Sequence, residues 1–107
     1  MTTFPDIEAT NSPRYVGVRE DELPFEFDWT AQGTPTAVTG VYCYDRTGTT
    51  VTGAVVGTPS ISGDNVQGFT VDCTKFTANA EYYLTCIVTI GGRERGMFCR
   101  ILAKPFP

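Results

Sequence analysis

The side chains in this sequence that are best suited to chemistry are four carboxylates close together near the N-terminus. They belong to Asp21, Glu22, Glu26 and Asp28, and paired carboxylates serve as general acid and base or as calcium ligands. Within residues 25–29, however, the two later carboxylates alternate with aromatic residues, which is typical of a strand with one face in solvent. Calcium also needs a loop rich in oxygen ligands, which this sequence lacks. We therefore interpret these carboxylates as a solvated strand face.

The rest of the sequence offers little for catalysis. The chain contains no histidine, which removes Ser-His-Asp and Cys-His nucleophile pairs and the side chain used most often as a general acid or base. Its glycines do not form a phosphate-binding loop, because no Gly-rich run follows a strand and opens a helix. The sequence therefore predicts neither an enzyme nor a cofactor.

The cysteines suggest disulfide bonds, a metal site or a buried core. Four cysteines would suit two disulfides in a secreted chain, but no Cys-x-x-Cys pair is present for zinc. Each of them lies within or ends an apolar alternation, and free cysteine is among the most buried residue types. We therefore expect core thiols and no metal site. A disulfide between the last two, facing each other across a hairpin, is the alternative that remains. The cysteines are Cys43, Cys73, Cys86 and Cys99.

The elements that position these side chains are strands. From Ala80 to Leu102, two runs of alternating apolar residues flank Gly91-Gly92-Arg93-Glu94, which predicts a β-hairpin with a four-residue turn. That turn places Ile90 opposite Arg95 and the last two cysteines opposite each other. No window carries the apolar stripe of a helix. The other strands are expected over residues 15–19, 25–29, 37–44, 49–56 and 66–73, with a loop or brief strand between the last two.

This arrangement favours an all-β fold, an immunoglobulin-like or fibronectin-like antiparallel β-sandwich of about seven strands. Trp29 on an early strand, and Tyr82 or Tyr83 at the start of a long late strand, fit the same fold. A length of 107 residues predicts one domain. The expected parts are an extended N-terminal arm over residues 1–13, the sandwich over 14–103 and a C-terminal tail over 104–107.

The charges and apolar segments of the chain indicate which classes of partner to expect. The net charge is −4, and the eight Lys and Arg residues are spread along the chain, whereas a nucleic-acid site needs clustered cations. No apolar stretch is long enough to cross a bilayer, and the N-terminus does not resemble a secretory signal. We therefore expect no nucleic-acid or membrane partner, and synthesis in the cytoplasm.

Candidate binding residues lie on strands, at the hairpin turn and in the terminal segments. Exposed tyrosines suit protein interfaces, but they equally suit cross-strand pairs on a sheet face, and both interpretations stay open. Charged residues at a hairpin turn suit either binding or ordinary solvation. The terminal segments contribute apolar anchors. The candidate partner-binding residues are Phe4, Ile7, Tyr42, Tyr44, Arg93, Arg95 and Phe106.

A family resemblance adds to this interpretation. The segment Arg19-Glu20-Asp21-Glu22-Leu23-Pro24-Phe25-Glu26-Phe27-Asp28-Trp29-Thr30 is followed by a Thr-rich body, and Ala80-Glu81-Tyr82-Tyr83-Leu84 leads into Gly91-Gly92-Arg93. This combination resembles small structural proteins of tailed bacteriophages, in which an acidic segment leads into an Asp-Trp-Ser/Thr strand. The resemblance covers residues 19–102, and the cysteines are not part of it. It implies an Ig-like virion component made in the host cytoplasm, without enzymatic activity and present in many copies.

The resemblance also suggests partners. A capsid decoration, or cement, protein would bind the major capsid protein, with its arm and tail attached by strand addition or apolar anchors. A head–tail junction or tail component is a close alternative, with other virion proteins as partners. An alternative of another class is a cell-surface module that binds carbohydrate or a receptor through Tyr42, Tyr44 and the charged turn at residues 93–95.

Overall fold

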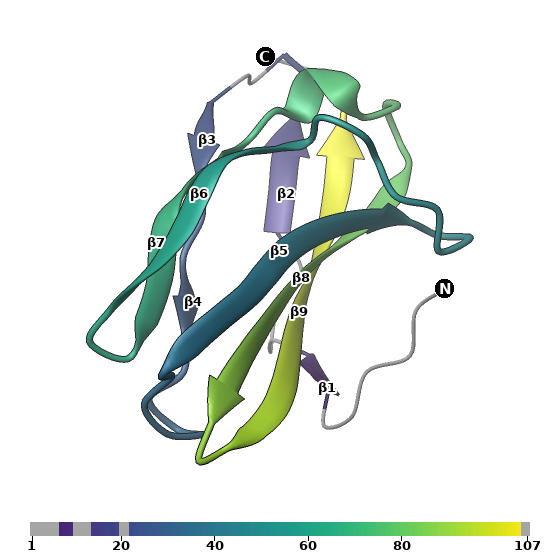
Figure 1. Cartoon of the computed structure of the whole chain (residues 1–107). Coiled ribbons are helices and arrows are strands. Elements are labelled where there is room, and N and C mark those ends of the chain that lie inside the picture. The colour runs from purple at the N-terminus through teal and green to yellow at the C-terminus, as the bar shows by residue number, and fades with distance from the viewer. Residues whose placement is uncertain (1–6, 10–13, 20–21, 106–107) are drawn as a thin grey trace.

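The computed structural model describes residues 7–9, 14–19 and 22–105, with only the backbone described for residues 7–9 and 14. Within these residues the chain forms nine strands and one short 3₁₀ helix, and no α-helix. The strands form two sheets that pack face to face (Figure 1), which confirms the predicted all-β sandwich. The elements are β1 (Ile7–Ala9), β2 (Arg14–Gly17), β3 (Leu23–Pro24), β4 (Phe27–Asp28), β5 (Ala37–Asp45), β6 (Val55–Ser62), β7 (Asn65–Val71), η1 (Cys73–Lys75), β8 (Glu81–Ile90) and β9 (Arg93–Lys104).

The first sheet, called sheet A, contains β1, β2, β5, β8 and β9. Strand β8 lies between β5 and β9 and is antiparallel to both. Strands β1 and β2 lie along the other edge of β9 and run parallel to it, beside residues 96–98 and 101–104. Part of the segment expected to form an extended arm is thus a short strand of the sheet. Strand β9 continues to Lys104, one residue past the predicted end of the sandwich.

The second sheet, called sheet B, has β7 at its centre, with β3 and β4 on one side and β6 on the other. Of the strand expected over residues 25–29, only Phe27–Asp28 (β4) is a strand, and the expected connection before it contains β3 at Leu23–Pro24. Pro24 lies on an edge of the sheet, where its missing N–H is tolerated. The strand expected over residues 49–56 was also misplaced. Thr50 forms an isolated bridge with Tyr44, and residues 52–53 form a turn with Gly53 at φ 82°. Strand β6 then runs through the segment expected as a loop or brief strand, with an irregularity between Gly57, at φ 97°, and Ser60.

The β8–β9 hairpin has a shorter turn than predicted. Gly91 and Gly92 have φ 58° and 76°, and positive φ at both central residues is the requirement of the two-residue type I′ turn. Ile90 therefore pairs with Arg93 rather than with Arg95. The predicted four-residue turn was wrong by two residues in register, because a Gly pair satisfies the tight turn on its own.

The same register separates the two cysteines that were considered for a disulfide. Cys86 pairs with Met97, and Cys99 pairs with Leu84. All four cysteines are free thiols, and three are buried in the core while Cys99 is half-buried, in agreement with the expectation of core thiols. Burial is the main cause that raises the pKa of Cys43 and of Cys86 to about 12.

The core contains two features that are typical of Ig-like sandwiches. Tyr82 stacks on Phe76 with ring centroids 4.1 Å apart, and its hydroxyl accepts a hydrogen bond of 2.7 Å from the backbone N–H of Thr77. This is a tyrosine corner, at one of the two positions predicted for it. The second is the fully buried Trp29, whose indole N–H lies near the Cys86 thiol and lowers its pKa by less than burial raises it. Sulfur is a weak acceptor, and the indole N–H has no full hydrogen bond.

A core truncation tests the packing between the sheets. Leu84 has no exposed surface, so Leu84→Ala removes buried methyl groups and leaves a cavity. We expect it to lower the free energy of unfolding by about 2–5 kcal/mol, measured by urea denaturation. Val56→Thr, at a side chain that is 47% exposed, is the matched control and is expected to change it by less than about 0.5 kcal/mol. Equal effects of the two variants would contradict the described core.

Thiol labelling tests the placement of the cysteines. Only the thiolate reacts with a disulfide reagent, and buried thiols with raised pKa values stay protonated. In the native protein at about pH 8 we expect Cys99 to be the one thiol that reacts quickly, and all four to react after unfolding without reductant. Fewer than four reactive thiols in the unfolded chain would reveal a disulfide and contradict the free cysteines.

Candidate functional site: an aromatic sheet face

Side chains of sheet A that point away from the core bring aromatic residues together. Even-numbered residues of β8 enter the core, so its odd-numbered residues point outward. In register across the sheet, Tyr44 pairs with Tyr83, which pairs with Arg100 of β9. One step along, Tyr42 and Phe98 lie on either side of the same position of β8. We call this surface the aromatic face; its aromatic residues are Tyr15, Tyr42, Tyr44, Tyr83 and Phe98.

The rings of the aromatic face support one another. The centroids of Tyr42 and Tyr44 lie 6.4 Å apart with planes tilted by 36°. Tyr83 and Phe98 form an edge-to-face pair with centroids 5.7 Å apart. Aromatic pairs at such separations contribute about 0.5–1.5 kcal/mol beyond the area they bury. All four side chains remain partly exposed, so the rings are held in place and still present surface to a partner.

A glycine makes room for one of these rings. The ring of Tyr42 lies over Gly40, where an added Cβ would stand 2.6 Å from its hydroxyl oxygen. A bulge between Val38 and Gly40 turns the strand here, and the Tyr42 hydroxyl donates a hydrogen bond of 3.5 Å to the carbonyl of Thr39. The local backbone of β5 therefore lays this ring flat along the sheet.

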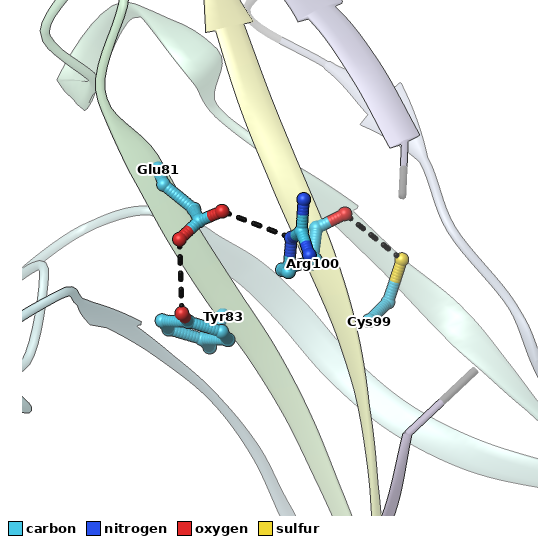
Figure 2. Close-up of polar contacts among 4 residues, drawn as sticks. All are labelled: Glu81, Tyr83, Cys99 and Arg100. Carbon is cyan, nitrogen blue, oxygen red and sulfur yellow. Dashed lines mark hydrogen bonds and ion pairs between the residues drawn. The ribbon is translucent and has the colours of Figure 1, made fainter. Parts of the chain in front are cut away.

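One carboxylate fixes two further side chains of the face (Figure 2). Tyr83 donates a hydrogen bond of 3.0 Å from its hydroxyl to Glu81 Oε2, and Arg100 Nε lies 2.9 Å from Glu81 Oε1. Because the hydrogen bond to Glu81 favours the neutral phenol, it is the main cause that raises the pKa of Tyr83, with burial second. Glu81 thus orients a tyrosine and an arginine together.

The fifth aromatic ring lies on β2. Tyr15 is 59% exposed and pairs in register with Leu102. Lys104 Nζ lies 5.2 Å from its ring centroid, within the range of a cation–π contact. This extends the aromatic face to the opposite edge of sheet A and brings a second cation onto it.

The outer side of sheet B has the opposite character. Its strands and their adjoining turns carry five carboxylates and, among the described residues, one cation, Lys75. Asn65 on β7 donates a side-chain hydrogen bond to Glu26, and the remaining outward residues are mostly Thr, Ser, Gly and Gln. Among the described residues, sheet B and its adjoining turns therefore carry several carboxylates and few cations. The carboxylates belong to Glu22, Glu26, Asp28, Asp64 and Asp72.

The candidate binding residues from the sequence do not form one site. Tyr42 and Tyr44 lie on the aromatic face, whereas Arg93 and Arg95 have the core-facing parity of β9 and lie at its hairpin end. Alternation along β9 therefore places them on the opposite side of sheet A from the tyrosines. Three other candidates lie outside the described residues: Phe4, Phe106 and the side chain of Ile7, whose backbone belongs to β1.

Sequence reasoning missed Tyr15, Phe98, Glu81 and Arg100 as members of the face. Phe98 and Arg100 lie between the apolar residues that define the core side of β9, so their parity alone would have placed them outward. The ion pair with Glu81 depends on the exact register, which the predicted turn missed.

The described residues contain neither a metal-binding group nor a membrane-spanning helix. None of them form a group of three or more His, Cys, Asp or Glu side chains that could hold a metal ion. No helix in the described part of the chain has the length and apolar character to cross a bilayer. No family model matches this chain, and neither the curated proteins nor the solved structures gave a match.

Removing the Glu81 carboxylate tests its contact with the Tyr83 hydroxyl. In Glu81→Gln we expect the pKa of Tyr83 to fall back toward about 10, measured by NMR titration of labelled tyrosine rings with Tyr83→Phe for assignment. Since the folded-state pKa is raised, the stabilisation is present below the ordinary tyrosine pKa and is lost as pH rises through the raised value. The stability difference between wild type and Glu81→Gln should therefore shrink in alkali. An unchanged Tyr83 pKa, equal to that in the control Glu94→Gln, would refute the contact.

Proposed function

We propose that this protein is a non-enzymatic structural component of a tailed bacteriophage virion, made in the host cytoplasm. Its role would be that of a capsid decoration, or cement, protein that binds the major capsid protein in many copies. The observation that carries the proposal is the aromatic face, together with the resemblance of residues 19–102 to small virion proteins. The aromatic face would be the surface that contacts the capsid.

The chemistry of the aromatic face supports a binding role. Tyrosine buries a large area at a small cost in side-chain entropy, and tyrosine and arginine dominate the centres of protein interfaces. Tyr42 is placed by Gly40, and Tyr83 by Glu81, so little side-chain freedom is left to lose on binding. A face built this way binds through area and shape, without a reaction.

The two faces together support one orientation on a particle. Sheet A would lie against the capsid, and the acidic, hydroxyl-rich side of sheet B would face solvent. Negative charge on sheet B would favour solubility and oppose binding through that side. A head–tail junction or tail component, bound to other virion proteins, would use the same surface.

Binding to shells tests the role. We expect the protein to bind saturably to empty shells of the major capsid protein from the encoding phage. Tyr42→Ser combined with Tyr44→Ser should weaken binding by at least roughly tenfold, measured by co-sedimentation. Gly40→Ala, which displaces the Tyr42 ring, should weaken it less.

Val56→Thr on sheet B is the control and should bind like wild type. Failure of the wild-type protein to bind shells, head–tail junctions or tails would refute the virion role. Retention on cell-surface glycans that is lost in the tyrosine variant, without shell binding, would instead support the carbohydrate or receptor module.

A further inference from the structure

We propose that the aromatic face recognises a carboxylate on its protein partner, and that Arg100 is the residue that binds this carboxylate. The inference rests on the proposed function, because it assumes that the aromatic face is a docking surface. It goes further by naming the chemistry that the partner must present.

Among the described residues, no group binds the terminal nitrogens of the Arg100 guanidinium. Arginine carries five N–H donors, and the contact with Glu81 uses Nε alone, at 2.9 Å. Within the described residues, the Arg100 side chain makes no other hydrogen bond or ion pair, and it is 49% exposed. The dashed contact in Figure 2 reaches the Nε side of the group. The two Nη atoms have no partner among the described residues, so their N–H groups can bind a carboxylate in a two-point contact.

The surroundings of Arg100 would strengthen such a contact. Phe98 and Leu102 precede and follow it on the same side of β9, and Tyr83 lies opposite it on β8. A charge-assisted hydrogen bond becomes stronger when apolar neighbours exclude water from it, and interface arginines of high binding energy are ringed by such neighbours. A partner that covers the rings would therefore also dehydrate the contact.

Glu81 is a positioning residue here. It holds Nε and the Tyr83 hydroxyl at the same time, so it fixes the direction of the guanidinium before a partner arrives. Its charge offsets that of Arg100, and Lys104 supplies a further cation four residues along the same side of β9. This part of the face thus has more positive than negative charge in a protein whose net charge is −4.

The charge pattern favours a protein partner over a nucleic acid. Two described cations beside a carboxylate do not form the cationic cluster that a phosphate backbone needs. Arg100 and Lys104 are about 13 Å apart along an extended strand, so the partner is expected to present carboxylates with a similar spacing, set among apolar residues. We therefore expect an acidic surface on the partner, opposite Arg100 and Lys104.

Substitution of Arg100 tests the inference on shells. Arg100→Gln is expected to weaken binding roughly tenfold. Arg100→Lys should restore only part of the loss, because lysine keeps the charge but lacks the paired N–H donors of the guanidinium. Lys75→Gln, which removes the same charge from sheet B, should bind like wild type. Urea denaturation confirms that the variants stay folded. Wild-type shell binding that Arg100→Gln leaves unchanged overturns the inference and leaves the proposed function intact.

A second measurement does not depend on shells. The full chain, labelled with ¹⁵N, is titrated with the capped peptide Glu-Thr-Val-Thr-Glu and with its Gln-Thr-Val-Thr-Gln counterpart. Shifts of the Arg100 Nε–H, which is assigned by its absence from Arg100→Lys, support the inference if they need the carboxylates, even if shells are not the partner. Equal shifts with both peptides, or no shift at all, overturn it. Tighter binding of a single-stranded oligonucleotide that depends on Arg100 also overturns it, in favour of a phosphate ligand.

Discussion

The structure depends on the register between β8 and β9, which the two-residue turn at Gly91 and Gly92 sets. With both glycines at positive φ, Ile90 pairs with Arg93, and every later pair along the hairpin follows. Because side chains alternate with a period of two, the same pairing that buries Leu84 also brings Tyr83 opposite Arg100. A turn two residues longer would keep each face intact but place Tyr83 opposite Leu102. The longer turn would leave the same residues facing the core, but it would separate Tyr83 and Glu81 from Arg100.

The turns between other strands share a local device. In the Asp-x-Thr segments that start at Asp28, Asp45 and Asp72, the carboxylate accepts hydrogen bonds from the backbone N–H and the hydroxyl of the threonine two residues later. Hydrogen bonds from threonine are the main cause that lowers the pKa of Asp28 and of Asp45. The stabilisation from these lowered pKa values is present at neutral pH and is lost as pH falls through them. Strand ends are thus held by short-range polar contacts, which leaves the long-range contacts to the core.

The parts of the fold that could be predicted are those that depend on alternation. The strands near 37–44 and 66–73, the hairpin and the corner tyrosine all follow from residue spacing. The strand expected over 49–56 fails because high β-propensity in Thr and Val is outweighed by turns at Asp45 and Gly53. Only part of the aromatic face could be predicted from the sequence. Tyr42 and Tyr44 are apparent from parity, but the contact of Glu81 with Arg100 joins two strands and needs the register as well as the parity.

The outer side of sheet A is partly covered by side chains of the sheet itself. A strand whose two sides are both apolar, as β8 is near Ile87, is usually covered on both sides. Here Ile87 has no exposed surface and lies in register between Gly40 and Gly96, beneath a face where the ring of Tyr42 crosses Gly40. Sheet A is therefore partly closed by its own side chains and is not a bare apolar sheet. Such a surface exposes ring edges and the Arg100 guanidinium, so a partner of the kind proposed would be selected by chemistry as well as by area.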